Sequence, residues 1–285
     1  MSRSSNLTIR PAVDQDRQSL ANLIHFELHV HRHLDWRPPL DWAGHQPYLI
    51  AEYRGKLAAA LICPPDPPEI AWIRLFATVS ELPVQEAWQA LWPVAQHELQ
   101  QQGSPQVAAI PLHAWFCTTL EHSHFSLSNE VVILLWERGT FMPPPKELPL
   151  TLRTITPGDF PSIREVDAVA FGPQWSDSED SLRYAYQQAT LATLTEDESG
   201  ILGYQISTPG PMGAHLARLA VHPRAQGRGI GYLLTHDLLR QFEQRGLLRV
   251  TVNTQQDNPA SLALYEKIGF RRTGEKYPVY QLSLQ

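Results

Sequence analysis

Apolar and polar positions alternate with two different periods along the second half of the chain. Short apolar runs bounded by turn residues predict strands over 150–155, 190–194, 200–207, 215–221 and 249–253. Apolar residues at helical spacing predict helices over about 159–170, 178–189, 232–245 and 259–267. A final pair of strands is expected around Phe270 and Tyr280. This order predicts an α/β (α+β) domain whose helices pack on a mixed, mostly antiparallel sheet.

The first half of the chain begins the same plan. A short strand-like run containing Arg10 precedes a helical stretch from about Asp16, and a run containing Arg153 precedes a helix opening at 157–159. Further matches keep an offset near 144 residues, as between Arg74 and Arg218. A repeat of whole-domain length indicates a duplication, because solenoid repeats have periods of about 20–50 residues.

A proline-rich stretch separates the two halves. Three successive prolines at 143–145 cannot lie inside a helix or a central strand. We therefore expect two tandem domains, residues 1–138 and 148–285, joined by a linker over 139–147.

Composition narrows the classes of partner. The 285 residues carry a net charge of −6, which argues against nucleic acid or an anionic membrane as the main partner. No run of about 18 apolar residues predicts a membrane span, and the polar start does not resemble a signal peptide. Cys63 and Cys117 show no metal or redox spacing. These features predict a soluble, cytoplasmic protein.

The residues after the strand 215–221 carry the clearest chemistry. Gly227, Gly229 and Gly231 let the backbone turn tightly and approach a ligand, and a helix begins at once. Unpaired N–H groups at a helix start suit a phosphate or pyrophosphate. A simple tight turn is the alternative. No Lys-Ser/Thr follows as in a P-loop, and Asn253 stands where a Rossmann fold expects an acidic residue.

Two blocks of sequence resemble the GNAT (GCN5-related) N-acetyltransferases. The first is the loop signature Gln226, Gly229 and Gly231 after Val221-His222-Pro223, and the second runs from Asn258 through Tyr265 to Gly269-Phe270. The resemblance is clear over about 150–285 and weak elsewhere. It implies that acetyl-CoA is the co-substrate, held by Leu219, Ala220, Val221, Gln226, Gly227, Arg228, Gly229, Ile230, Gly231, Tyr232 and Asn258.

The same resemblance implies roles in catalysis. Tyr265 would donate a proton to the departing thiolate, although it could instead be a core aromatic residue. Asn258 would bond the pantetheine arm or cap the following helix. Main-chain groups of Leu219 and Val221 would pair with pantetheine like an added strand. His215 stands where several relatives have a glutamate base, so it is either the base or a solvated histidine at a strand end.

The first half lacks these features. No glycine lies in the matching loop over 78–84, and Leu120 and His113 stand at the places of Tyr265 and Asn258. This half is expected to be a degenerate copy, kept as a scaffold or as one wall of the acceptor site. His25 and His29 have the spacing of ligands on one helix, but no further ligand pattern completes a site, so we expect no metal.

The acceptor is the least determined feature. In the family, the segment corresponding to 170–177 lines the acceptor pocket, and its aromatic-proline-tryptophan-serine pattern resembles the branch that acetylates protein N-termini. Acidic residues at 177–180 would instead attract a small cationic amine. Ser176, with Glu179 three residues on, could merely cap the next helix.

The sequence thus predicts an acetyl-CoA-dependent N-acetyltransferase that acts on a primary amine, of a small molecule or a protein N-terminus, by direct attack on the thioester. The alternative is a noncatalytic acyl-CoA-binding regulatory or sensor protein. The acceptor and the oligomeric state do not follow from the sequence.

Overall fold

The computed structural model describes residues 7–210 and 213–284. The chain forms two compact units. The first contains the residues up to Ser128 together with those from Tyr277 onward, and the second runs from Asn129 to Lys276. These bounds differ from the domains expected from the sequence. The strand that follows the first repeat pairs with a strand of the second, and the end of the last strand pairs with a strand of the first.

Unit 1 has two groups of paired strands. One sheet has the order β1-β3-β4-β6-β2, and β7 pairs with β5 and with the end of β14. Its elements are β1 (Leu7–Pro11), α1 (Arg17–Phe26), β2 (His29–Arg32), β3 (Tyr48–Tyr53), β4 (Lys56–Ile62), β5 (Ile70–Trp72), β6 (Leu75–Thr78), α2 (Val84–Gln101), β7 (Gln106–Ala109) and α3 (Ala114–Glu121).

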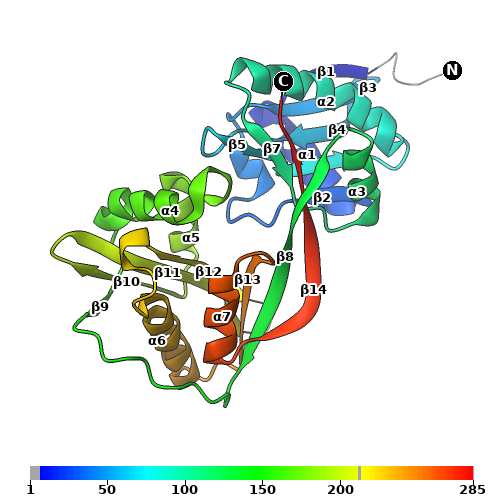
Figure 1. Cartoon of the computed structure of the whole chain (residues 1–285). Helices are drawn as coiled ribbons and strands as arrows, with labels where there is room; N and C mark the ends of the chain where they lie inside the picture. The colour runs from blue at the N-terminus through cyan, green and yellow to red at the C-terminus, as the bar shows by residue number, and fades with distance from the viewer. Residues whose placement is uncertain (1–6, 211–212, 285) are drawn as a thin grey trace. The chain divides into compact units, whose positions relative to one another are not determined.

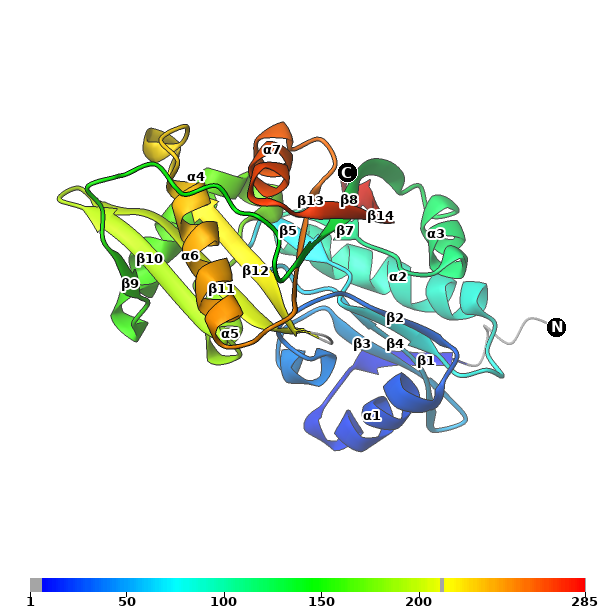
Figure 2. The same cartoon turned by 90° about the horizontal axis from the view of Figure 1, so that it is seen from below.

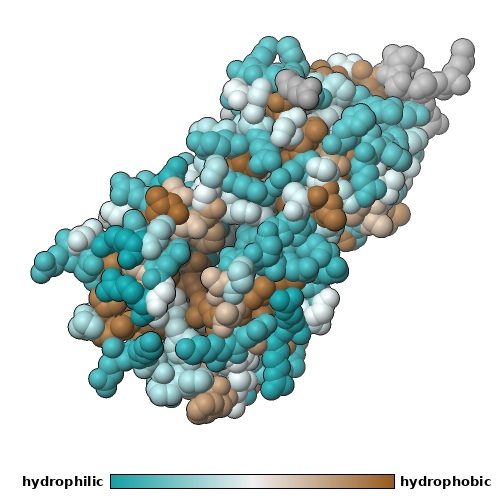
Figure 3. Space-filling view, viewed as in Figure 1, coloured by the Kyte–Doolittle hydropathy of each residue, from teal (hydrophilic) through white to brown (hydrophobic). Residues whose placement is uncertain are grey.

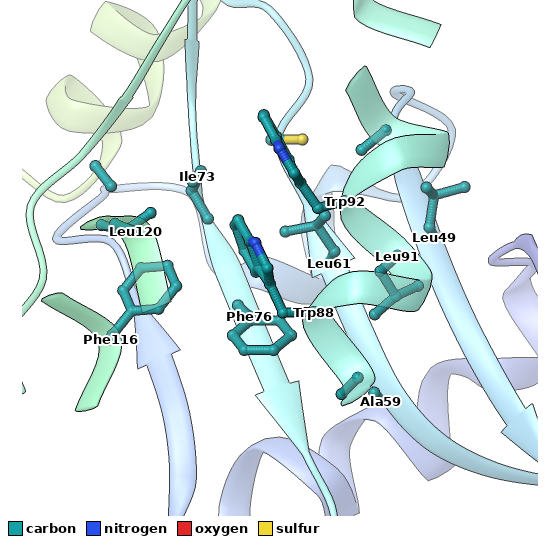
Figure 4. Packing of buried hydrophobic residues seen from close by; sticks show 14 of the residues in the cluster. Leu49, Ala59, Leu61, Ile73, Phe76, Trp88, Leu91, Trp92, Phe116 and Leu120 are labelled. Atoms are coloured by element: carbon teal, nitrogen blue, oxygen red, sulfur yellow. The ribbon is translucent and has the colours of Figure 1, made fainter. Parts of the chain in front are cut away.

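Helical spacing of large apolar residues places α2 on the core of unit 1. Trp88, Leu91 and Trp92 recur at three- and four-residue steps, so they share one face of the helix. Figure 4 shows this face packed on Leu61 and Phe76 of the strands. The helix α1 covers the other face of the sheet with a separate apolar cluster.

Unit 2 is built on one sheet with the order β8-β13-β12-β11-β10-β9. Figures 1 and 2 show α6 and α7 on one face of this sheet and α4 and α5 on the other. The elements are β8 (Ser126–Glu137), β9 (Leu152–Thr154), α4 (Phe160–Trp175), α5 (Glu179–Gln187), β10 (Leu191–Asp197), β11 (Gly200–Gly210), β12 (Gly213–Val221), α6 (Ile230–Gln244), β13 (Arg249–Gln255), α7 (Pro259–Ile268) and β14 (Arg271–Leu282).

The end of the chain differs from the prediction. We expected a pair of strands around Phe270 and Tyr280, but β14 is one continuous strand. Its first residues belong to unit 2, where Thr273 Oγ1 donates to the Ile133 carbonyl, and its last residues pair with β7 in unit 1. The strand β8, which follows the first repeat, pairs with β13 of unit 2.

The two units repeat a specific ion-pair arrangement. Arg10 on β1 bonds the carboxylates of Asp16 and Glu52. Arg153 on β9 bonds Asp159 and Glu196 in the same way. Each member of one set is 143 or 144 residues from its counterpart. This shared geometry agrees with a duplicated domain.

Candidate active site

Strands β12 and β13 diverge in the middle of the unit 2 sheet. They pair in parallel only where Ala214–Leu216 face Val250–Val252. Beyond this point β12 continues along β11 as far as Val221, while β13 continues along β8 as far as Gln255. A β-bulge in the β11–β12 ladder adds to the bend. The β13-facing edge of Arg218–Val221 therefore lacks a β-ladder partner among the described residues.

The glycine loop follows directly from this edge. Gly227 and Gly229 have φ angles of 74° and 92°. A Cβ at either position would meet nothing within 4 Å, so it is the left-handed backbone that favours glycine there. Gly231 differs, because its Cβ would lie 3.2 Å from Leu264 Cδ2. Gly231 therefore allows α6 to approach α7 closely.

The start of α6 presents main-chain donors to the loop. The Leu233 N–H bonds the Gly229 carbonyl at 2.9 Å. The N–H groups before it in the first turn have no acceptor inside the helix. Ile230 is buried and anchors this turn against the sheet. Gln226 Nε2 donates to the Val221 carbonyl at 3.0 Å and ties the loop to the strand end. The loop, with exposed Arg228 in it, is suited to bind a pyrophosphate.

Two of the expected cofactor residues have structural contacts of their own. The Tyr232 hydroxyl donates to the Pro143 carbonyl at 2.6 Å and holds the proline-rich linker. Asn258 Oδ1 accepts the Ser261 N–H at 3.0 Å and caps α7. The structure therefore contains the helix cap that was the alternative role for Asn258. The Tyr232 hydroxyl is bonded to the linker, so any hydrogen bond of Tyr232 to acetyl-CoA would come from its main chain.

Tyr265 lies on α7, on the same face of the sheet as α6. Its side chain is 5% exposed and packs against Phe270, with ring centroids 5.5 Å apart. Burial raises the pKa of Tyr265 well above its ordinary value, so the hydroxyl stays protonated and can donate. Ala220 is buried, and Leu219 packs against two apolar clusters that include residues of α6.

His215 points to the opposite face of the sheet. Its neighbours Ala214 and Leu216 join the cluster under α6 and α7, and side chains alternate along a strand. His215 Nδ1 lies 2.9 Å from Thr251 Oγ1. Burial lowers the pKa of His215, so the ring is neutral at pH 7 and able to accept a proton.

A buried ionic network that the sequence did not reveal lies between β12 and α4. Arg218 donates to both carboxylate oxygens of Asp167 on α4 at 2.7 Å, and also to the Trp175 carbonyl. Arg218 makes an ion pair with Asp177 at 3.2 Å. The Tyr204 hydroxyl donates to Asp167 as well. In the sequence, this network is indicated only by Asp167 among the apolar residues of α4 and by Arg218 in the middle of β12.

This network holds the segment 170–177 over β12. The helix α4 extends to Trp175, beyond the expected end near 170, and is kinked at Gly172, which has a φ of 70°. Phe171 covers the Arg218 guanidinium at 3.6 Å from the ring centroid. The alternative that Ser176 caps the next helix is wrong, because Ser178 Oγ accepts the Ser181 N–H and caps α5.

Two further expectations concern metal and membrane. The helix α1 ends at Phe26 and His29 opens β2, so His25 and His29 do not share one helix. Among the described residues no group of three or more His, Cys, Asp or Glu side chains could hold a metal ion. Over the same residues, no helix has the length and apolar character needed to cross a bilayer.

Comparison with known proteins relates part of unit 2 to acetyltransferases. Residues 160–270 match the model of the acetyltransferase (GNAT) family. The mycothiol acetyltransferase of Amycolatopsis mediterranei is 32% identical over 142 residues, which are 43% of this chain and 46% of that protein. The [ribosomal protein bS18]-alanine N-acetyltransferase of Salmonella typhimurium is 26% identical over 120 residues, 42% of this chain and 80% of that protein.

Solved structures with a similar fold cover nearly the whole chain. A GCN5-related N-acetyltransferase from Sphaerobacter thermophilus superposes with a TM-score of 0.63 at 17% identity, over 98% of this chain and 96% of that one. A tandem GNAT protein from the clavulanic acid biosynthesis pathway gives 0.63 at 14% identity, over 98% and 99%. At such identities the likeness concerns the fold alone. The sequence match spans less than half the length of the mycothiol acetyltransferases.

Proposed function

We propose that this chain transfers an acetyl group from acetyl-CoA to a primary amine, because residues 160–270 match the model of the acetyltransferase (GNAT) family. The observation that carries the proposal is the divergence of β12 from β13 next to the glycine loop and α7. The unpaired edge of β12 can bond the amide groups of pantetheine like an added strand. The start of α6 can bond the pyrophosphate.

His215 and Tyr265 support a direct transfer in two half-steps. They extend to opposite faces of the sheet at the place where β12 and β13 part. The amine nitrogen attacks the thioester carbon, and His215 takes the proton that this nitrogen loses. A main-chain N–H on the open edge of β12 would stabilise the oxyanion.

The second half-step breaks the carbon–sulfur bond. The departing thiolate takes a proton from the Tyr265 hydroxyl, which regains one from His215 by way of water. The thiol is an ordinary leaving group with a pKa of about 8.5 in water. Tyrosine is the weaker acid in water by about 1.5 pKa units, so this proton transfer costs about 2 kcal/mol there. Burial raises the pKa of Tyr265, and it raises the pKa of a thiol beside it in the same direction.

The acceptor would approach from the α4 face, beside the segment 170–177. Asp167 and Asp177 together carry two negative charges against one on Arg218. The excess negative charge suits a cationic amine, and aromatic Phe171 and Trp175 lie in the same segment. In the space-filling view, hydrophobic residues gather at the centre of the visible face of unit 2, with hydrophilic residues around them (Figure 3). A small amine or a protein N-terminus would both fit this chemistry.

The test is acetyl-CoA turnover by the full chain. Release of the CoA thiol would be followed with N-terminal peptides, polyamines, amino acids, amino sugars and aminoglycosides as acceptors. Acetylation of at least one amine, confirmed by a mass increase of one acetyl group, is the expected result. Tight acetyl-CoA binding without transfer to any of them would indicate the acyl-CoA-sensing protein instead.

A further inference from the structure

Unit 1 keeps the strand framework that forms the proposed cofactor groove of unit 2. The parallel pairs of β5 with β7 match those of β12 with β13, residue for residue, at an offset of 144. The β4–β6 ladder likewise matches the β11–β12 ladder at offsets of 144 and 143. Leu75–Thr78 of β6 are therefore the counterpart of Arg218–Val221, whose open edge is proposed to bind pantetheine.

In unit 1 this edge is occupied by the chain itself. The strand β2 pairs antiparallel with β6, from His29 opposite Thr78 to Arg32 opposite Leu75. The His33 N–H extends the ladder to the Arg74 carbonyl at 2.9 Å. The other edge of β6 is taken by β4, so β2 lies on the side where β12 and β13 diverge in unit 2.

His31 fills the deep end of the same groove. Its side chain is 1% exposed, and its Nε2 lies 3.0 Å from the carbonyl oxygen of Ile73. Ile73 directly follows the last β5–β7 pair, and its N–H bonds the Ala108 carbonyl on β7. The His31 ring stacks on Phe116 of α3 at a centroid distance of 4.2 Å. His31 therefore lies at the end of the β5–β7 pairing, the place that corresponds to the divergence of β12 and β13 in unit 2.

The helix α3 stands in the place of α7. His113 is its N-cap, as Asn258 is the N-cap of α7, and Leu120 stands at the place of Tyr265. Figure 4 shows Phe116 and Leu120 of α3 directed toward Phe76 of β6. Phe76 and Phe116 stack at 5.8 Å. Apolar side chains thus fill the region that holds the reacting groups in unit 2.

We infer that β2 is an internal substitute for pantetheine, which closes the cofactor groove of unit 1 so that the chain binds one acetyl-CoA and not two. This inference rests on the function proposed for unit 2. A strand that belongs to the same chain competes at a high effective concentration, so dissolved acetyl-CoA does not displace it. Removing β2 would also leave the β6 edge without its ladder partner.

A disulfide between β2 and β6 tests the inference directly. Val30 and Ala77 are opposite partners in an antiparallel ladder, where Cα atoms lie about 4.5–5.5 Å apart and a disulfide is allowed. We expect the Val30→Cys/Ala77→Cys chain to bind one acetyl-CoA with the same Kd, within about twofold, before and after reduction. Two molecules bound after reduction, against one before, would overturn the inference.

Hydrogen exchange supplies a second readout. The amides of His29–Arg32 and Leu75–Thr78 should exchange at the same slow rate with and without saturating acetyl-CoA. A loss of their protection on addition of acetyl-CoA would show that the ligand displaces β2, and would overturn the inference.

Calorimetry on Gly229→Glu separates the two proposals. We expect no acetyl-CoA binding by this variant, and retained binding by Gly246→Glu, which introduces the same charge at another left-handed glycine after α6. One molecule still bound to Gly229→Glu, together with a loss of protection of the β2 amides, would place a site in unit 1 and overturn the inference. If the unaltered chain bound none while β2 stayed protected, the proposed function would fail but the occupied edge would stand.

Discussion

Arg218 on β12 donates two hydrogen bonds of 2.7 Å to the fully buried carboxylate of Asp167 on α4. The pair is the main ionic link between the sheet and the helix that carries the segment 170–177. It also fixes the kink after Phe171, because the Asp177 N–H donates to the same carboxylate at 2.7 Å. The wall of the proposed acceptor site is therefore set by a buried charge pair.

Replacing Asp167 by Asn should destabilise unit 2 strongly. Arg218 would keep only its ion pair with Asp177, and the Tyr204 hydroxyl and the Asp177 N–H would also lose the buried carboxylate that they bond. Breaking a buried pair from one side costs up to about 3–5 kcal/mol. The expected result is a lower urea midpoint for the unit 2 transition. Glu179→Gln is the matched control, because its half-exposed pair with Arg183 is worth less than about 1 kcal/mol. Equal midpoints for the two variants would contradict the role assigned to the network.

Replacing Tyr265 by Phe should lower kcat by about a hundredfold or more, in the range of lost general-acid catalysis. The acetyl-CoA Kd should change little, because the buried ring and its packing on Phe270 are kept. Turnover and binding would be measured on the same preparation. Tyr186→Phe removes a hydroxyl that donates to the Ile155 carbonyl in unit 2, and should leave kcat within about twofold. A fully active Tyr265→Phe enzyme would assign Tyr265 to the core alone.

The role of His215 should appear in the pH profile. Burial lowers the pKa of His215 below its ordinary value near 6.5, so the neutral, proton-accepting form prevails at pH 7. Activity that depends on this base should fall as pH drops below 6.5 through the lowered pKa. His215→Gln should lose most of kcat/KM, and the fall of the remaining activity below pH 6.5, the acid limb of the profile, should disappear. The exposed His122→Gln serves as control and should keep both, and an unchanged limb in His215→Gln would exclude His215 as the base.

Local patterns in the sequence predicted the parts of the site that local chemistry determines. The glycine loop, the cap at Asn258 and the strand–helix order of unit 2 depend on neighbouring residues, and the structure has them. The strand β2 was not predicted, since His29–Arg32 lack an apolar alternation and pair only with a distant strand. The pairing of β8 with β13 joins residues more than a hundred positions apart, so no local pattern shows it.

The Arg218–Asp167 pair escaped prediction for a related reason. In the sequence, Asp167 is a single polar residue of a helix. Only the fold shows that the helix face which carries Asp167 is buried against β12. The assignment of Asn258 and Tyr232 to acetyl-CoA stays a prediction. Both side chains have a structural partner in the folded chain, and neither partner excludes a main-chain contact with the ligand.

Unit 1 should lose stability in mild acid because of His31. Burial lowers the pKa of His31 to about 4, below its value near 6.5 in an unfolded chain. The unfolded state therefore binds more protons as pH falls, so the stabilisation is complete above pH 6.5 and is lost progressively down to about pH 4. The loss from this residue should be roughly 2 kcal/mol at pH 5. Urea unfolding at pH 7 and pH 5, followed by hydrogen exchange of the β6 amides, would measure it.

The variant His31→Phe removes this titration while it retains a ring to stack on Phe116. It should be less stable than the unaltered chain at pH 7, because the contact with the Ile73 carbonyl is lost, yet it should lose less stability between pH 7 and pH 5. Burial also lowers the pKa of His33, so part of the acid sensitivity should persist. His122→Phe, at an exposed position, controls for the loss of a histidine. An undiminished acid response in His31→Phe would show that protonation of the β2 strand at His31 does not limit the stability of unit 1.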